Sequence, residues 1–287
     1  MMSNTGEISC SGVVIPGILY GTAWKKDATA DLVELALKSG FRGFDTACQP
    51  KHYDEKQVGL GLQAIGKFGL ERKDIYLQTK FTPLSSQDPE NLPYCKTDPV
   101  AQQVMQSFEV SQANLKTDYL DALLLHSPLE SHEQTMQAWR ALEEISHCGG
   151  ARLLGITNCY DLDVFKALYS DAKVKPAIVQ NRFYKDTNYE IKMREFCTQQ
   201  GIVFESFWSL TANKTALDST LLKNLSAEYQ KTPAQVFFRY LSQSGIVPLS
   251  GTCSELHMKD DLEIFSFSLP EEDMNEINQM LVTGLSV

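Results

Sequence analysis

Short apolar runs alternate with amphipathic segments along most of this chain. Eight mostly apolar runs of four to eight residues predict buried β-strands, at residues 13–20, 41–47, 75–81, 119–126, 153–157, 178–183, 202–207 and 246–249. Between and after these runs, apolar residues recur with a period near 3.6 and predict helices, at residues 28–39, 54–68, 100–115, 133–148, 162–169, 189–200, 221–230, 233–242, 255–264 and 269–280. Strands and helices therefore follow one another in eight successive units.

This alternation predicts the fold class, because strands joined by helices form a parallel sheet. Eight such units favour a closed (β/α)8 TIM barrel, which we expect to be a single domain over residues 1–287. The length alone would also allow two modest domains, but no linker, low-complexity segment or change of composition divides the chain. An open Rossmann sheet would need GxGxxG after a strand, and the nearest fragment, Gly59-Leu60-Gly61, lies inside a predicted helix.

Two long loops interrupt this regular pattern. Residues 82–98 are rich in Pro, Ser and Asp, and residues 209–220 form the second loop. Loops of this length in a compact domain are usually functional or disordered. Since the first loop leaves the strand end that carries Lys80, we expect it to form a lid or a wall of a pocket.

Composition narrows the classes of partner. A net charge of −10 argues against nucleic acid and anionic membrane as partners, but a local cationic pocket could still bind an anionic cofactor. No apolar run is long enough for a membrane helix, and the polar first ten residues lack the core of a signal peptide. Seven scattered cysteines without a CxxC spacing predict reduced thiols in a cytoplasmic protein and no metal site.

Chemically reactive side chains stand at the carboxyl ends of three successive predicted strands. Asp45, Lys80 and His126 hold these positions, and Tyr53 follows the first of them. Ligands bind at this edge of α/β proteins. Each residue alone has an ordinary alternative: a hydrogen-bonded buried Asp, a solvated Lys, or a His satisfied at the barrel rim. Their shared position favours a proton-transfer site.

The expected chemistry is protonation of a carbonyl oxygen. Lys80 near Tyr53 would lower the tyrosine pKa from about 10, and Asp45 would keep Lys80 charged and in place. Tyr53 could then act as the general acid, while His126 donates a hydrogen bond to the same oxygen. Because no nucleophilic Ser or Cys motif is present, the attacking group is expected to be a bound hydride donor.

From about residue 17 to residue 269 the chain resembles the aldo-keto reductase superfamily. The motifs that carry this resemblance are Gly21-Thr22-Ala23-Trp24, Gly43-Phe44-Asp45-Thr46-Ala47, Tyr53-Asp54-Glu55-Lys56-Gln57-Val58-Gly59, Gln78-Thr79-Lys80, Asp118-Tyr119-Leu120-Asp121, Leu124-Leu125-His126, Gly155-Ile156-Thr157-Asn158 and Val179-Gln180-Asn181. The resemblance implies a (β/α)8 barrel, NADPH-linked reduction of aldehydes or ketones, and a catalytic tetrad of Asp45, Tyr53, Lys80 and His126. We expect a fungal-type member with an insertion before the catalytic Tyr.

The same resemblance implies contacts with the cofactor. Asn158 and Gln180, with Thr157, would bind the nicotinamide carboxamide, and Phe207 would stack on the ring, where the family more often has Tyr. Ser209 and Leu210 would lie against the pyrophosphate, and Ser250, Gly251 and Thr252 would meet the adenosine end. The further residues expected at the cofactor are Gly21, Thr22, Ala23, Asp45, Trp208, His257 and Asp261.

Three departures from the family pattern bear on function. Residues 48–52 place Tyr53 about three residues further from Asp45 than is usual, so the loop must bulge. Leu249 stands where a Lys commonly meets the 2′-phosphate, leaving His257, Lys259 and Lys214 as substitutes and making NADH use possible beside NADPH. The tail after Met280 is short, which predicts an open substrate pocket.

The substrate is expected to be a small carbonyl compound. Trp24, His52 and Trp208 are predicted to line its pocket, with Pro93 and Tyr94 as further candidates, which suits hydrophobic or aromatic carbonyls without excluding sugars. His126, where steroid double-bond reductases of the family have Glu, favours carbonyl reduction. We expect a monomer or dimer.

Two other function classes stay open. The chain could be an NADP(H)-binding regulatory or sensor protein with slow turnover, which a measured rate with a simple aromatic aldehyde would distinguish. It could also be a barrel lyase that uses Lys80 as a Schiff base, which borohydride trapping would reveal. The lyase hypothesis leaves Asn158, Gln180 and Phe207 without a role.

Overall fold

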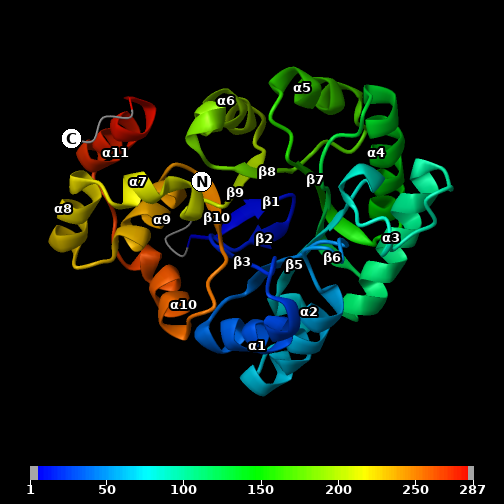
Figure 1. Cartoon of the computed structure of the whole chain (residues 1–287), viewed down its shortest axis with the longest axis horizontal. Helices are drawn as coiled ribbons and strands as arrows, with labels where there is room; N and C mark the ends of the chain where they lie inside the picture. Colours follow the sequence, from blue (N-terminus) through cyan, green and yellow to red (C-terminus); the bar gives the residue numbers. More distant parts are fainter. Residues whose placement is uncertain (1–5, 284–287) are drawn as a thin grey trace.

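Eight parallel strands close into a barrel in the computed structural model, which describes residues 6–283 (Figure 1). The strand order around the barrel is β10-β3-β4-β5-β6-β7-β8-β9. The strands are β3 (Leu19–Gly21), β4 (Gly43–Asp45), β5 (Tyr76–Phe81), β6 (Leu120–Leu125), β7 (Ala151–Thr157), β8 (Ile178–Arg182), β9 (Val203–Phe207) and β10 (Ile246–Ser250). The predicted (β/α)8 barrel is confirmed.

The α-helices surround this barrel (Figure 1). They are α1 (Thr29–Ser39), α2 (Glu55–Leu62), α3 (Val100–Leu115), α4 (His132–His147), α5 (Leu162–Asp171), α6 (Ile191–Gln200), α7 (Lys214–Leu217), α8 (Thr220–Tyr229), α9 (Pro233–Gln243), α10 (Glu255–Leu262) and α11 (Glu271–Thr283). Large side chains such as Trp139, Phe165 and Phe237 are fully buried in the main hydrophobic core. This burial fixes the ring of helices on the barrel.

The first predicted strand, residues 13–20, is wrong as one element. The structure divides it into β2 (Val13–Ile15), which pairs antiparallel with β1 (Ile8–Cys10), and the barrel strand β3. Pro16 lacks an N–H for a sheet ladder, and a Cβ on Gly17 would collide with the Gly6 carbonyl oxygen, so the chain turns between the two strands. The hairpin formed by β1 and β2 places its apolar side chains in an inner hydrophobic cluster. This cluster also contains residues from the first positions of several barrel strands.

Several other predicted boundaries differ from the structure. Helix 54–68 is α2 followed by the 3₁₀ helix η2 (Gln63–Phe68), and the predicted loop 209–220 contains η6 (Thr211–Asn213) and α7. Helix 189–200 begins as α only at Ile191, because the three residues before it have positive φ within η5 (Lys185–Glu190). The remaining 3₁₀ helices are η1 (Lys26–Ala28), η3 (Arg72–Asp74), η4 (Leu84–Ser86) and η7 (Glu263–Ser266).

Local sequence signals begin and end the helices near the expected positions. Gly40 ends α1 with φ 119°, a backbone conformation that glycine adopts without strain. Thr232 and Gln235 form a capping box at the start of α9, with Pro233 in its first turn. These signals explain why the helix positions could be predicted from the sequence alone.

The chain's last described element is α11, which runs on to Thr283. Most of the short tail after Met280, residues 284–287, and the first five residues considered for a signal peptide lie outside the described residues. Among residues 6–283, no helix combines the length and apolarity needed to cross a membrane.

Candidate active site

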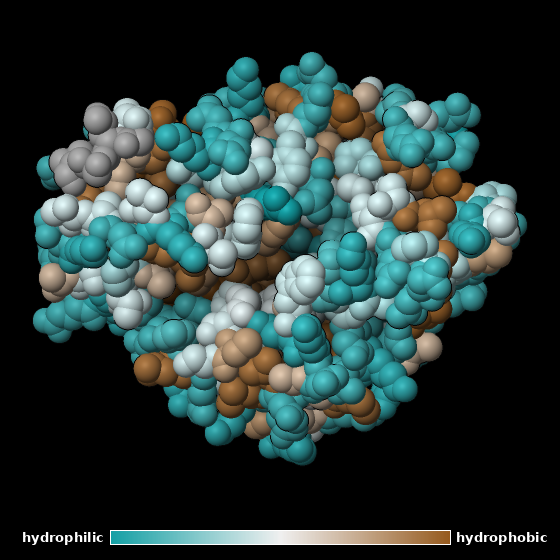
Figure 2. All heavy atoms as spheres, viewed as in Figure 1, coloured by the Kyte–Doolittle hydropathy of each residue, from teal (hydrophilic) through white to brown (hydrophobic). Residues whose placement is uncertain are grey.

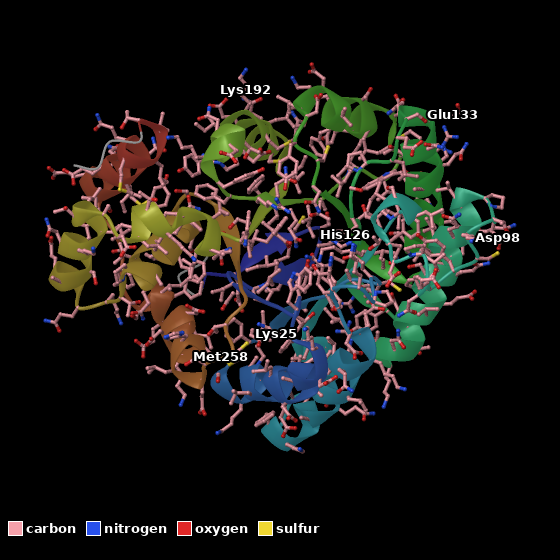
Figure 3. The ribbon with its side chains drawn as sticks, viewed as in Figure 1. Lys25, Asp98, His126, Glu133, Lys192 and Met258 are labelled. Carbon is pink, nitrogen blue, oxygen red and sulfur yellow. The ribbon has the colours of Figure 1, made fainter. Side chains whose placement is uncertain are left out.

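A cleft of about 1250 Å³ opens at the carboxyl ends of the barrel strands. The space-filling view shows a hollow near the middle of this face, with hydrophilic and hydrophobic residues around it (Figure 2). In the same view His126 lies near the middle of the barrel, and Lys25 lies closer to α1 and α10; both residues line the cleft (Figure 3). The cleft therefore lies at the edge where α/β barrels bind ligands.

A buried ion pair forms beneath the floor of this cleft. Lys80 Nζ donates to Asp45 Oδ1 at 2.6 Å, to Asp45 Oδ2 at 2.7 Å and to the Thr46 carbonyl oxygen at 2.8 Å. Both side chains are almost completely buried. β4 and β5 are neighbours in the barrel, so the strand ends that carry Asp45 and Lys80 lie side by side. The two opposite charges therefore neutralise each other inside the protein. The predicted pairing of Asp45 with Lys80 is thus present.

A second carboxylate, Glu205 of β9, joins this network and was missed in the sequence analysis. Gln78 Nε2 donates to Asp45 Oδ1 at 2.7 Å and to Glu205 Oε2 at 2.8 Å, and Gln180 Nε2 donates to the same two oxygens at 3.0 and 2.8 Å. Burial, with the nearby Asp45 charge, raises the pKa of Glu205 to about 7. Its other oxygen, Oε1, has no hydrogen-bond partner among the described residues. The sequence did contain a signal for this residue, because Glu205 is an acidic residue inside a predicted buried strand, residues 202–207.

Tyr53 reaches the same floor despite the insertion before it. The amides of His52 and Tyr53 both donate to the Gln49 carbonyl at 3.0 Å, so the extra residues form a compact turn. The Tyr53 ring then lies with its centroid 5.5 Å from Lys80 Nζ and 6.0 Å from the His126 ring, edge to face. The bulge required by the sequence is present, and the four predicted catalytic residues come together.

The expected fall in the Tyr53 pKa is wrong for this structure. Burial raises the pKa of Tyr53 above its ordinary value, and the negative charge of Asp45 raises it further. Lys80 does not counter this effect, because its ammonium group is held by the Asp45 carboxylate and makes no hydrogen bond to the Tyr53 hydroxyl in the described chain. Tyr53 is therefore a protonated phenol at neutral pH.

His126 is also uncharged. Burial lowers its pKa well below the ordinary value, and the charges of Lys80 and His52 lower it further. Its Nδ1 lies 2.6 Å from the Thr82 hydroxyl oxygen. When that hydroxyl donates to Nδ1, the neutral ring carries its proton on Nε2 and can donate it to a ligand.

The residues expected at the nicotinamide and at the pyrophosphate also line the cleft. Thr157, Asn158, Gln180, Phe207, Trp208, Ser209 and Leu210 all belong to its wall. The amides already have partners: Gln180 Nε2 faces the two carboxylates, and Asn158 Nδ2 donates to the His126 carbonyl at 2.9 Å. The half-buried ring of Phe207 has the flat face that stacking requires.

Two tryptophans and a histidine form the outer wall. The ring centroids of Trp24 and His52 are 4.1 Å apart, and Trp24 and Trp208 are both exposed. All three residues line the cleft, as predicted for the substrate pocket. Pro93 and Tyr94 do not line it: the Tyr94 hydroxyl instead donates to the Thr82 carbonyl inside the protein. The loop 82–98 contributes Ser86 to the wall.

The other end of the cleft lies beside β10 and α10. Gly21, Ala23, Ser250, Gly251, Thr252, His257 and Asp261 line it as predicted, whereas Thr22 is buried and donates to the Asp45 carbonyl at 2.9 Å. Ser250 Oγ donates to Asp261 at 2.5 Å, and burial raises the pKa of Asp261 to about 6. Of the three proposed substitute cations, only His257 belongs to the lining, and Lys259 pairs with Glu255 at 3.0 Å.

No group of three or more His, Cys, Asp or Glu residues within 6–283 could hold a metal ion. The seven cysteines form no disulfide with one another, and Cys48, close to the site, is buried.

Comparison with known proteins identifies the family. The family model described as "Aldo/keto reductase family" matches residues 16–282. Glyoxal reductase of Bacillus subtilis is 29% identical over 86% of this chain and 82% of its own length, and prostaglandin-E(2) 9-reductase of Oryctolagus cuniculus is 27% identical over 94% and 89%.

Solved structures agree with this match. Gox0644, in its apo form, superposes with a TM-score of 0.79 at 27% identity, covering 96% of this chain and 93% of its own. The aldo/keto reductase from Brucella melitensis has a TM-score of 0.80 at 24% identity, covering 96% and 98%, and shows the fold. The fungal-type subclass stays a prediction. The chain belongs to the aldo/keto reductase family and is an NAD(P)H-dependent oxidoreductase.

Proposed function

We propose that this chain reduces aldehyde or ketone carbonyls to alcohols, with Tyr53 as the general acid and Lys80, Asp45 and His126 in support. The observation that carries the proposal is the meeting of these four side chains at the floor of one cleft, with the Tyr53 ring against both Lys80 and His126. Each comes from a different part of the barrel rim, so their convergence is a property of the fold.

The protonation states suit reduction. Tyr53, whose pKa is raised, holds a proton that the developing alkoxide can accept. The neutral His126 can donate a hydrogen bond from Nε2 to the same oxygen. When Tyr53 gives up its proton, the Lys80 ammonium is the cation beside the resulting phenolate. Asp45 holds that ammonium in place from the opposite side.

We infer that the cofactor is NADPH, with NADH also accepted. The bound dihydronicotinamide would supply the hydride to the carbonyl carbon. Phe207 offers a half-buried ring face for stacking, and Thr157, Asn158 and Gln180 place amide and hydroxyl groups beside it. At the far end Lys25 and His257 are joined in the lining by Leu249, Asp260 and Asp261. The Lys25 ammonium donates to the Gly251 and Thr252 carbonyl oxygens, and the two aspartates oppose its charge, which weakens the selection for a 2′-phosphate.

The direct test is the replacement Tyr53→Phe, which removes only the acidic hydroxyl. We expect NADPH-dependent reduction of an aromatic aldehyde to fall by at least about 100-fold, since general acid catalysis contributes that much. Binding of NADPH and, separately, NADH, followed by tryptophan fluorescence, should stay near the wild-type affinities. The measurement is NADPH consumption under saturating cofactor.

Tyr119→Phe is the matched control. Tyr119 stacks between Arg72 and Arg152, outside the cleft, so its variant should retain wild-type rates. If Tyr53→Phe keeps most of its activity, another group supplies the proton and this assignment is wrong. If the wild-type chain binds neither cofactor, the hydride-transfer proposal fails.

A further inference from the structure

The wall of the cleft contains an arginine without an acidic partner. Arg182 is the last residue of β8 and is half-buried. Its Nε is buried without a hydrogen bond, and the guanidinium forms no ion pair with any residue from 6 to 283. The chain has 36 acidic residues and 26 basic ones, so a shortage of carboxylates does not explain why Arg182 has no acidic partner. Elsewhere Arg72 and Arg152 both pair with Asp121, at 2.9 and 3.3 Å.

Aromatic rings hold this guanidinium in position. Its Cζ lies 4.8 Å from the Trp208 ring and 5.9 Å from the Phe207 ring. A cation over a ring face is attracted to the ring but keeps its charge. The planar guanidinium can still donate hydrogen bonds from its edge, in the geometry that a carboxylate accepts. The arrangement therefore presents an oriented positive charge to the cleft.

The rest of this part of the cleft has no free negative charge. Asp45 is the acid that lines the cleft near Tyr53, and it is paired with Lys80. The remaining lining acids, Asp260 and Asp261, lie on α10 at the other end. Lys51, from the insertion before Tyr53, adds an exposed cation to the lining. A half-buried charge without a counterion is costly, so an incoming anion would be stabilised here.

We propose that Arg182 binds a carboxylate of the substrate, so that the preferred substrates are aldehydes or ketones that carry a carboxylate group. This inference rests on the proposed function. Gln180 contacts Asp45 at the cleft floor, and Arg182 lies two residues further along β8, or about 6.6 Å along the strand. The carboxylate would therefore lie further from the cleft floor than Gln180, with the aromatic wall of Phe207 and Trp208 beside it.

A matched substrate pair tests the inference. We would compare 4-carboxybenzaldehyde with its methyl ester, which keeps the ring and the aldehyde but removes the charge. The wild-type chain should show the higher kcat/KM for the acid. Arg182→Gln should lower kcat/KM for the acid by about 10- to 100-fold, the range expected for a hydrogen bond to a charged group, and change the ester little. Arg182→Lys should restore part of the preference.

Arg239→Gln is the control variant. Arg239 on α9 is also half-buried with an unpartnered Nε, but it does not line the cleft, so its variant should keep the wild-type preference. A wild-type chain that reduces both compounds equally well, or prefers the ester, would overturn the carboxylate proposal while leaving carbonyl reduction intact.

A binding measurement tests the contact between Arg182 and a carboxylate without turnover and without the cofactor. The alcohol product, 4-(hydroxymethyl)benzoate, should quench the fluorescence of the neighbouring Trp208 in the wild-type chain and bind more weakly to Arg182→Gln. This result would stand even if no hydride transfer were found. If Arg182→Gln instead weakens NADPH binding and slows both substrates equally, the anion at Arg182 is the cofactor's phosphate and the proposal is wrong.

Discussion

Thr82 contacts the histidine at the floor of the cleft. It follows β5 by one residue, and its hydroxyl oxygen lies 2.6 Å from His126 Nδ1. Nothing in the alternation of apolar and polar residues indicated this contact, which requires the ends of β5 and β6 to be neighbours. A neutral imidazole has a single proton, so the group bound at Nδ1 decides whether Nε2 can donate to a substrate. We therefore infer that Thr82 positions His126 by donating its hydroxyl proton to Nδ1.

We predict that Thr82→Val lowers kcat/KM for aldehydes by about tenfold, the effect of losing roughly one hydrogen bond, because the valine keeps the shape but cannot fix the His126 tautomer. Steady-state kinetics would measure this, and fluorescence titration should show unchanged NADPH affinity.

Thr82→Ser serves as the control, because it keeps the hydroxyl group and should retain most of the activity. A purely structural role for Thr82 would instead lower the thermal stability of Thr82→Val and weaken cofactor binding together with the rate. Wild-type kinetics in Thr82→Val would show that His126 needs no partner at Nδ1.

At the scale of elements, two glycines allow α2 to pack closely on its neighbours. A Cβ on Gly59 would collide with the Asn114 carbonyl oxygen of α3, and a Cβ on Gly61 would lie 2.6 Å from the Ala30 carbonyl oxygen of α1. The Gly59-Leu60-Gly61 fragment therefore serves helix packing, in agreement with its place inside a predicted helix. Since α2 follows Tyr53 directly, this packing also anchors the segment that carries the proposed acid.

Gly59→Ala should lower the free energy of unfolding by about 1–3 kcal/mol, because the added methyl group forces α2 and α3 apart. Urea titration followed by circular dichroism would measure the loss. Gly66→Ala, in η2, is the matched control: its Cβ would meet open space, so stability should be unchanged or slightly higher. Equal stabilities of the two variants would contradict the close packing.

At the scale of the whole molecule, the barrel interior joins two carboxylates from opposite parts of the sequence. Asp45 of β4 and Glu205 of β9 share the amide groups of Gln78 and Gln180. Lys80 neutralises Asp45, whereas Glu205 forms no ion pair within residues 6–283, and its pKa is raised to about 7. Tyr76 adds a hydrogen bond to Gln78 at 2.9 Å. The interior therefore favours a protonated Glu205.

The raised pKa of Glu205 makes the stability of the fold depend on pH in a defined direction. The folded pKa of Glu205 lies above the unfolded value of about 4.3, so its contribution to stability is complete below that value and is lost as pH rises through about 7. The full loss is on the order of 3 kcal/mol. Glu205→Gln should therefore melt at a higher temperature than the wild-type chain at pH 8, with a much smaller difference at pH 5.

Melting curves at the two pH values test this directly. Glu195→Gln, at an exposed position of α6, is the control that removes the same charge from the surface. The difference in melting temperature between the wild-type chain and Glu205→Gln could instead be the same at pH 8 and at pH 5. That result would mean that Glu205 is ionised at both pH values and that the network supplies a counterion.

Much of the fold could be predicted because its helices and strands follow from local sequence patterns. Helices α3, α4 and α9 begin and end within a residue of the predicted positions, since apolar period and capping residues are properties of consecutive positions. Residues 13–20 were predicted wrongly because apolar character does not say which partner strand a segment pairs with. β2 pairs with β1 outside the barrel, and β3 pairs inside it.

By itself, the sequence determined the barrel class through its periodicity and the family through its motifs. It also supplied the four residues proposed for catalysis, which stand at or just after predicted strand ends. Only the tertiary structure decided the protonation states and the partners: a raised Tyr53 pKa, a Thr82 contact on His126, a Glu205 beside Asp45 and an unpaired Arg182. Burial and charge pairing act between residues that are distant in the chain. Their effects exist only once the strands have closed into the barrel.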